Sequence, residues 1–542
     1  MLFENQTLKP SWLWTFFTLI PSVLSISKHP ILIVVSFDAF RYNFFDTEQL
    51  PYMELIRHKG VYADFLVNVF PTKTFTNHHT ISTGLYAESH GVVGNSFYDP
   101  LYKKVIKIGP EMYNYNVDVK PIWRLNEDMG DERYSATVMW PGAIFSYQNK
   151  NVTWRLPFES GYDWHERVDH VITWITDPNK PANLVMLYFE EPDTHGHAFG
   201  PNSPVVKDLI HKLDNITGYL NQQINSHGLS ENVNVIFVSD HGMTAVTPPR
   251  FLNITQYITN GTYIWAGVSP VIQIIPNEGF HDTIYNSLTA AAKENGHFKV
   301  YNKSEYLERW HLKNNRRAAP ILVVADIGYA FDDLIRDAPK YAEKYNFTLT
   351  NSSEFGVHGY DYMEPEMHPY FMAIGPKIKQ QTKVEPFQTV DLFNVFCAIL
   401  DIPPTDNNGT MLPVQQILQE TTGKYSIGTV VMISGGFSFY AKLQTIILFV
   451  FLTEVIVFQH FGFQILVIIC VLFLKFYFLF YHLNKVFDIL SVFNVCIQGF
   501  INRTRIIYDI SAKSLHSYFC SLPHLKGCGY FNNRTKACMT NL

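Results

Sequence analysis

The side chains with the clearest potential for chemistry are one threonine and a set of aspartates and histidines. Thr74 lies in the run 71–75, PTKTF, and a threonine hydroxyl becomes a useful nucleophile only when a base or a metal lowers its pKa. Carboxylates and imidazoles are the ligands expected of an open, catalytic zinc site. The chain supplies candidates of this kind at Asp38, Asp193, His197, Asp240, His241 and His358. We therefore predict two zinc sites around Thr74.

Apolar strands must position these groups. The runs 31–37, 184–189 and 233–239 are largely apolar and rich in β-branched residues, which predicts strands buried on both faces of a sheet. The candidate ligands Asp38, Asp193 and the pair 240–241 follow these runs in turn. Ligand groups of α/β sheets lie at the carboxyl ends of strands, although Asp38 taken alone fits a helix cap equally well.

Segments with helical spacing alternate with these strands. The alternation predicts an α/β layered domain with a central, mostly parallel sheet flanked by helices. We expect helices at 76–83, 206–221 and 387–400, and further strands at 270–276 and 321–325. A nucleophile at the amino end of the first helix would lie beside backbone N–H groups, which favour an anionic phosphate.

One glycine and three more histidines lie close to these candidates. Gly196 permits a tight turn, which would let Asp193 and His197 converge on one ion. We assign His78 and His79 to packing and helix-face roles, and His195 to the surroundings of the metal or to the surface.

Composition excludes some classes of function. The 542 residues suffice for a large core, and the net charge of −6, with no basic run, argues against binding to a nucleic acid duplex. Cys397 is the only cysteine before the strongly apolar C-terminal part, so no disulfide can form within the preceding domain. We expect Cys397 to be a buried thiol.

The two ends of the chain resemble targeting segments. Residues 1–27 resemble a signal peptide, with an uncleaved anchor or a buried helix as alternatives. The region 443–481 is strongly apolar, and one span near 461–481 is long enough to cross a bilayer; two spans in a hairpin are the alternative, and 482–542 form a tail. We expect 28–424 to be an extracellular domain at the plasma membrane. Its sequons favour secretion: Asn151, Asn215, Asn253, Asn260, Asn302, Asn346, Asn351 and Asn408.

Together the motifs resemble the ectonucleotide pyrophosphatase/phosphodiesterase family of the alkaline phosphatase superfamily. The resemblance covers about residues 30–410 and is closest to the short members, which have a catalytic domain and one C-terminal membrane span. The motifs that carry it are VSFD at 35–38, TKTF at 72–75, TGLYAESHG at 83–91, EEPD at 190–193 and SDHGM at 239–243. It implies an alkaline-phosphatase-like fold.

The resemblance also implies a role for each candidate. One zinc would be bound by Asp38, Thr74, Asp240 and His241, and the other by Asp193, His197 and His358. Asn95 would bind a phosphate oxygen, while Phe75 and Phe158 would hold a nucleobase between their rings. The chain departs from the family at Thr76, where proline is usual, and it lacks the paired cysteines of the family's catalytic domain.

The expected activity is that of a zinc-dependent ecto-phosphodiesterase. Thr74 would attack the α-phosphorus of an extracellular nucleotide, such as ATP, ADP, a dinucleoside polyphosphate or NAD, and hydrolysis of the nucleotidyl-threonine would release a nucleoside 5′-monophosphate. Membrane lipid would be a second partner, through the C-terminal span. Three alternatives remain: a phosphomonoesterase, an enzyme that cleaves lysophospholipids or choline phosphodiesters, and a catalytically inactive adhesion ectodomain, which the intact ligand set disfavours.

Overall fold

The computed structural model describes residues 26–420. The predicted signal peptide falls almost entirely outside this range, and the apolar region 443–481 and the tail 482–542 fall wholly outside it. These assignments therefore stay predictions. Within residues 26–420, no helix combines the length and the apolar character needed to cross a membrane.

A central sheet of eight strands organises the described residues. Its order is β19-β2-β18-β9-β1-β8-β6-β7, and β18 alone runs opposite to the others. The α/β architecture with a mostly parallel sheet is therefore confirmed. The strands are β1 (Ile31–Phe37), β2 (Val61–Ala63), β6 (Tyr134–Val138), β7 (Trp154–Leu156), β8 (Ala182–Phe189), β9 (Val233–Val238), β18 (Phe371–Ile374) and β19 (Thr382–Val384).

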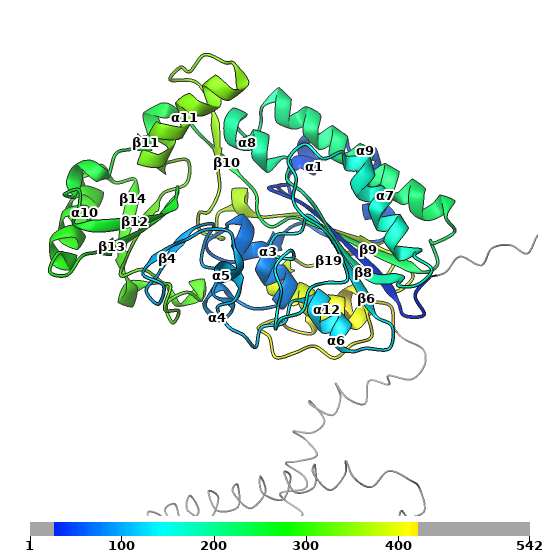
Figure 1. Cartoon of the computed structure of the whole chain (residues 1–542). Helices are drawn as coiled ribbons and strands as arrows, with labels where there is room; N and C mark the ends of the chain where they lie inside the picture. Colours follow the sequence, from blue (N-terminus) through cyan, green and yellow to red (C-terminus); the bar gives the residue numbers. More distant parts are fainter. Residues whose placement is uncertain (1–25, 421–542) are drawn as a thin grey trace, which may run out of the picture. The chain divides into compact units, whose positions relative to one another are not determined.

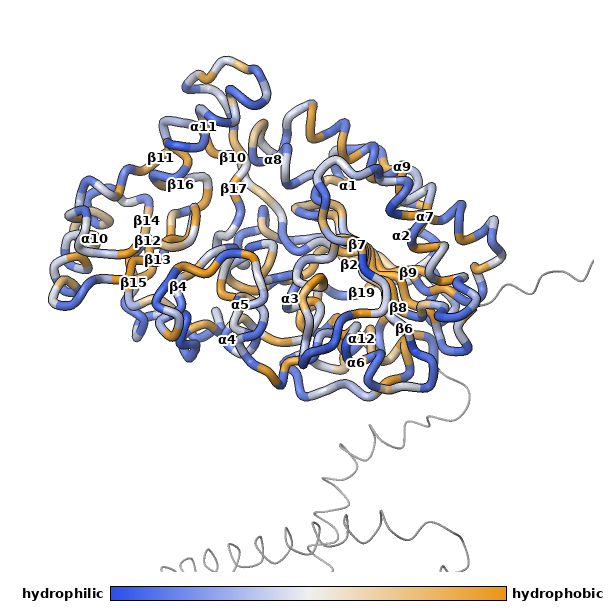
Figure 2. Tube along the Cα trace, viewed as in Figure 1, coloured by the Kyte–Doolittle hydropathy of each residue, from blue (hydrophilic) through white to orange (hydrophobic). Residues whose placement is uncertain are grey.

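The three middle strands β1, β8 and β9 end at the same edge of the sheet. All their residues are buried, because helices cover both faces, and Figure 2 shows the hydrophobic residues gathered along β8 and β9. In the parallel register Phe37 lies opposite Phe189, and Ser36 lies opposite Val238. The residues that directly follow β1, β8 and β9 therefore lie close together at one edge of the sheet.

Two groups of helices cover the sheet (Figure 1). One group packs together on β6, β8 and β18: α2 (Pro51–Lys59), α7 (Trp164–Ile175) and α9 (Pro204–Ser226). The other packs on β1 and β6: α3 (Thr74–Thr83), α6 (Ile122–Asp128) and α12 (Leu392–Ile399). Helix α9 begins after Ser203, whose hydroxyl accepts a hydrogen bond from the Val206 N–H at 3.3 Å, a common N-cap.

The predicted helix at 387–400 differs from the observed structure. Residues 389–391 form a 3₁₀ turn, and α12 begins only at Leu392. Helix α13 (Leu412–Ile417) follows, so α12 is not the final helix of the described residues. Cys397 lies in α12 as a buried free thiol, as predicted.

A second, antiparallel sheet has its own hydrophobic core. Its order is β12-β13-β15-β14, and helix α10 packs on β14. The sequence predicted two of these strands but not their separate sheet, because an apolar run does not reveal its pairing partner. The elements are β12 (Tyr263–Val268), β13 (Val271–Pro276), α10 (His281–Asn295), β14 (Phe298–Asn302) and β15 (Ile321–Ala325).

Short elements join the two sheets. β10 (Thr244–Val246) pairs antiparallel with β17 (Phe355–Val357), and α8 (Asp193–Phe199) lies against β17. This pairing brings the chain after β17 back toward the end of β9. The remaining helices and strands are α1 (Phe44–Thr47), β3 (Leu66–Val67), α4 (Ala87–His90), β4 (Phe97–Asp99), β5 (Lys104–Ile106), α5 (Pro110–Tyr113), β11 (Phe251–Leu252), β16 (Ala330–Phe331), α11 (Asp332–Tyr345) and β20 (Phe387–Gln388).

Candidate active site

Thr74 is the first residue of α3, two residues earlier than the predicted start of that helix. Lys73 before it is extended, with φ −114° and ψ 146°, so the chain enters the helix sharply at Thr74. The Thr74 side chain is buried, and its Oγ1 lies 3.2 Å from Nε2 of His241. The predicted nucleophile therefore contacts a predicted metal ligand directly.

The first predicted ligand set meets at the ends of β1 and β9. His241 Nε2 lies 3.4 Å from Asp38 Oδ1 and 3.0 Å from Asp240 Oδ2. All three residues are buried. With the Thr74 hydroxyl, they form a compact set of two carboxylates, one imidazole and one alcohol.

The second predicted ligand set forms beside α8. Asp193 Oδ2 lies 3.4 Å from His197 Nε2, and Asp193 Oδ1 lies 3.5 Å from His358 Nε2. Asp193, His197 and His358 offer ligand atoms that all lie within 4.8 Å of one another.

The prediction of a tight turn at Gly196 is wrong, because residues 193–199 form helix α8. Asp193 and His197 converge because they lie four residues apart on one face of the helix α8. Gly196 has a different use, since a Cβ there would lie 2.6 Å from the sulfur of Met243. The glycine therefore lets α8 pack closely against Met243.

The two ligand sets belong to one site. Asp38, Asp193 and His241 also group within 4.8 Å, which links the first set to the second. The imidazole rings of His241 and His358 stack with their centroids 3.6 Å apart. All six predicted ligands and Thr74 are thus brought together.

Unpaired carboxylate oxygens test whether cations fit this site. Among the described residues, Asp38 Oδ1, Asp193 Oδ1 and Asp240 Oδ2 are buried without a hydrogen-bond partner. The second oxygens of two of them are satisfied, because Tyr188 donates to Asp38 Oδ2 at 2.6 Å and the Ala39 N–H donates to Asp240 Oδ1 at 3.2 Å. Buried charges without partners are costly, and bound metal ions would pair with these oxygens.

The three candidate histidine ligands share one orientation, with Nδ1 toward a backbone carbonyl and Nε2 toward the site. Nδ1 of His241, His197 and His358 lies 2.9, 2.8 and 2.9 Å from the carbonyl oxygens of residues 242, 356 and 72. A carbonyl only accepts, so each Nδ1 has the proton and each Nε2 presents a lone pair to the site. Ligands of metal ions are usually oriented in this way. The donor set fits two metal ions.

The pKa values of the ligand groups show that the site favours a bound cation. Burial raises the pKa of Asp38 well above its usual value, and the neighbouring Asp240 adds to the shift. Burial also opposes ionisation of Asp240, but His241 and His78 outweigh it and keep the pKa of Asp240 well below its usual value. Burial and His241 lower the pKa of His358 far below its usual value, which favours the neutral imidazole that binds metals.

Residues 32–361 match the family model of type I phosphodiesterase / nucleotide pyrophosphatase. The chain belongs to this family. Human ectonucleotide pyrophosphatase/phosphodiesterase family member 5 is 35% identical over 393 residues, which cover 71% of this chain and 78% of the relative. Human bis(5′-adenosyl)-triphosphatase ENPP4 is 35% identical over 392 residues, covering 71% and 81%.

Solved structures agree with the assignment. Murine ENPP5, as an inactive threonine-to-alanine variant in complex with AMP, matches with a TM-score of 0.65 at 35% identity, covering 72% of this chain and all of that one. Human ENPP5 gives the same TM-score at 34% identity and the same coverage of this chain. The chain is therefore a hydrolase of the nucleotide pyrophosphatase/phosphodiesterase family with an alkaline-phosphatase-like fold, and the family depends on metal ions.

The predicted phosphate-binding residue lies beside the nucleophile. Asn95 Oδ1 accepts the Phe75 backbone N–H at 3.0 Å. One N–H at the start of α3 is therefore already occupied by the protein and is not free for phosphate. The same contact fixes the orientation of the amide, so the NH₂ group of Asn95 is the part that can donate to a phosphate oxygen.

The two predicted base-binding rings lie in different environments. Phe75 is half-buried and packs against the main hydrophobic core. Phe158 follows β7 and is 55% exposed, so it is not a core aromatic. Whether the rings face one another across a ligand stays a prediction.

Three residues with contacts to the site were missed or undervalued from the sequence. Lys73 is buried, and its Nζ donates to the carbonyls of His358 and Ser269, both at 2.6 Å. Burial lowers the pKa of Lys73 to about 8. Tyr188 donates to Asp38, and its lone hydroxyl within an apolar strand was the available signal. His78 contacts Asp240 and is considered further below.

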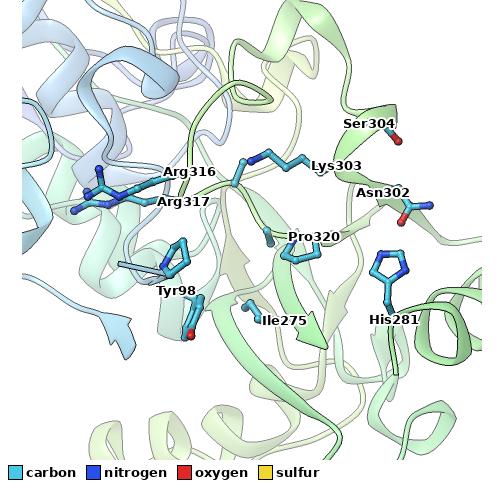
Figure 3. Close-up of a pocket in the computed structure, with 12 residues that line it drawn as sticks. Tyr98, Ile275, His281, Asn302, Lys303, Ser304, Arg316, Arg317 and Pro320 are labelled. Atoms are coloured by element: carbon cyan, nitrogen blue, oxygen red, sulfur yellow. The ribbon is translucent and has the colours of Figure 1, made fainter. Parts of the chain in front are cut away.

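A separate surface hollow of about 610 Å³ contains none of the predicted site residues (Figure 3). Its cationic side chains already have protein partners. Arg316 and Arg317 bind Asp99, and Lys303 donates to the Asn315 carbonyl at 2.7 Å. The charges of the hollow therefore stabilise the fold.

Proposed function

We propose that this protein is a zinc-dependent nucleotide pyrophosphatase/phosphodiesterase that uses Thr74 as its nucleophile. The observation that supports this most strongly is the position of Thr74 Oγ1, 3.2 Å from His241 Nε2. Around it lie Asp38, Asp193 and Asp240, each with one buried oxygen that lacks a hydrogen-bond partner among the described residues. A hydroxyl among unpaired metal-ligating groups has the environment that activates a weak nucleophile.

The metal ions would be held by the two ligand sets. Zinc bound there would lower the pKa of the Thr74 hydroxyl and counter negative charge on the phosphate oxygens. Thr74 Oγ1 forms a bond to phosphorus as the bond to the leaving oxygen breaks, which gives a nucleotidyl-threonine. Water then cleaves this ester, releases a nucleoside 5′-monophosphate and regenerates the threonine hydroxyl. The Asn95 NH₂ group donates to a non-bridging phosphate oxygen.

Nucleotides are the proposed substrates. The relatives support this class, since one is a bis(5′-adenosyl)-triphosphatase and another was solved with AMP. The inactive threonine-to-alanine variant of that relative supports a threonine nucleophile. We extend the class to ATP, ADP, dinucleoside polyphosphates and NAD, with the base held between Phe75 and Phe158.

The proposed location is the outer face of the plasma membrane. The signal-like start, the sequons and the apolar region 443–481 support it. Intact cells expressing the full chain should then hydrolyse an added nucleotide without permeabilisation. Activity that emerged only after lysis would reject this location.

A substrate panel tests the function. The full chain is assayed with ATP, diadenosine triphosphate, NAD, p-nitrophenyl phosphate and lysophosphatidylcholine, and the products are identified. Release of nucleoside 5′-monophosphate from the nucleotides at the highest kcat/KM is expected. Faster release of choline phosphate would reject the nucleotide assignment in favour of a lipid substrate, and faster cleavage of p-nitrophenyl phosphate would indicate a phosphomonoesterase.

A further inference from the structure

His78 lies one helical turn after Thr74 and is completely buried. Its Nδ1 lies 2.9 Å from the carbonyl oxygen of Thr74 and 3.3 Å from Oδ2 of Asp240. Its Nε2 lies 2.9 Å from the hydroxyl of Ser36 in β1. One imidazole therefore contacts the backbone of the nucleophile, a metal-ligand carboxylate and the strand before Asp38.

These partners determine where the ring proton lies. A peptide carbonyl and a carboxylate oxygen only accept hydrogen bonds, so Nδ1 of His78 must be the N–H. In the neutral ring Nε2 then has the lone pair and accepts from the Ser36 hydroxyl. Asp38, His78 and Asp240 lie close enough to hold a cation, but a protonated Nδ1 offers that cation no lone pair.

Neighbouring side chains restrict rotation of the ring. The rings of Trp140 and Tyr188 meet His78 edge-on, each with centroids 5.1 Å apart. Trp140 is tied to the same helix, since its Nε1 donates to the Ser82 hydroxyl at 3.0 Å and that hydroxyl donates to the His78 carbonyl at 2.7 Å. The Nδ1–H direction is therefore fixed by packing.

We propose that His78 is a positioning residue that sets the distance between the nucleophile and the metal, and that it is not itself a ligand. Its single N–H donates to the Thr74 carbonyl at 2.9 Å, and the same nitrogen lies 3.3 Å from Asp240 Oδ2, so one fixed ring spaces the backbone of the nucleophile from a ligand carboxylate. The inference rests on the proposed function, in which Thr74 and Asp240 act at one metal. Partners that orient metal ligands in this way are typically worth 10–100-fold in metal affinity or activity.

The next residue on the same helix is a matched control. His79 is also completely buried and also packs against aromatic rings, those of Tyr113 and Tyr147. Among the described residues, neither of its ring nitrogens has a hydrogen-bond partner. His78→Phe and His79→Phe therefore remove the same ring from the same buried helix, and only the first removes a contact to the metal site.

The experiment measures zinc affinity of the full chain by competition with a chelator, and kcat and KM separately. His78→Phe should weaken zinc binding about 10–100-fold and lower kcat more than it raises KM. His78→Asn should recover most of both, because its amide NH₂ can donate from near the position of Nδ1. His79→Phe should bind zinc like the unchanged chain, whatever its melting temperature.

Three outcomes would overturn the proposal. Equal loss of zinc in His78→Phe and His79→Phe would mean that only packing matters. Failure of His78→Asn to bind better than His78→Phe would remove the role of the N–H. A cobalt-substituted His78→Phe protein with one fewer nitrogen ligand in its absorption spectrum would make His78 a ligand. Zinc affinity needs no substrate, so a chain that binds zinc but cleaves no nucleotide would reject the proposed function alone.

Discussion

At the scale of single residues, the site depends on one hydroxyl among charged neighbours. Thr74 has no carboxylate base of its own among its hydrogen-bond contacts in the described residues, where Oγ1 meets only His241 Nε2. Since that nitrogen belongs to a candidate metal ligand, the proposed mechanism makes activation of the hydroxyl depend on bound metal. Removal of the hydroxyl and removal of the metal should therefore both abolish turnover.

Thr74→Ala should lower kcat by several orders of magnitude, as loss of a nucleophile does in other hydrolases. Folding should change little, because the substitution keeps the Cβ at the start of α3. Steady-state kinetics and a thermal melt of the same preparation test both statements. A variant that kept a tenth of the original kcat would exclude Thr74 as the nucleophile.

The two predicted base-binding rings can be tested with a substrate that lacks a base. Phe75→Ala and Phe158→Ala should each lower kcat/KM for a nucleotide about 5- to 150-fold, the range that about 1–3 kcal/mol of stacking implies. The loss on bis-p-nitrophenyl phosphate should be much smaller. Phe158 is the cleaner case, since an exposed ring contributes little to the core. Equal losses on the two substrates would mean that the rings do not hold the base.

At the scale of elements, the strand ends collect the ligands, and a buried lysine joins the two sheets. Lys73, just before α3, donates to the carbonyl of His358, just after β17, and to the carbonyl of Ser269, between β12 and β13. The Ser269 N–H and hydroxyl in turn donate to Asp333 at the start of α11. The position of the second ligand set is thus coupled to the antiparallel sheet.

Lys73→Met should leave two buried carbonyls without donors, at a cost of about 1–3 kcal/mol each, and should weaken zinc retention at the His358 side of the site. Lys303→Met is the control, because Lys303 also donates to a backbone carbonyl but contacts no ligand. Chemical denaturation and zinc content are measured for both. If Lys73→Met lost stability while it kept all its zinc, the coupling would be wrong.

The sequence predicted these elements where local pattern was sufficient. The bounds of β15 and of β1, with Asp38 after it, match the predicted runs. Helix α3 ends at Thr83, as predicted, and Gly84 after it has a φ of 68°, which suits glycine. The sequence correctly predicted that Asp193 and His197 converge, but it placed them on a tight turn where the structure has a helix. Gly196 suggested the turn, because the sequence does not reveal that Met243 packs against this glycine. The contact of Lys73 with His358 and that of His78 with Asp240 were beyond prediction, because each joins residues 160 or more positions apart.

At the scale of the whole molecule, the described residues form one layered domain, and its candidate metal ligands gather in one cluster. The ligands come from both ends of the family match, from Asp38 to His358. Bound metal ions should therefore stabilise the whole domain and not only one loop, because their binding energy adds to the free energy of unfolding.

Metal removal tests this expectation. The purified chain should contain about two zinc ions. Extensive dialysis against a chelator should abolish activity and lower the melting temperature, and added zinc should restore both. His358→Ala should lose one zinc before the other, because the second ligand set has no fourth protein ligand. Elemental analysis that found a single metal ion, or magnesium alone, would contradict the two-zinc site.

The order of strands in the central sheet has a consequence for synthesis. β1 is made first, yet its neighbours β8 and β9 begin at Ala182 and Val233. β1, which is almost wholly apolar, must therefore wait for its second partner until more than 200 residues have been made. His358 is made later still, so the second metal ion can be captured only after nearly the whole domain has been translated. If the chain binds two zinc ions as proposed, metal loading is a late event in the life of the nascent chain, and maturation would depend on the zinc supply in the compartment where folding ends.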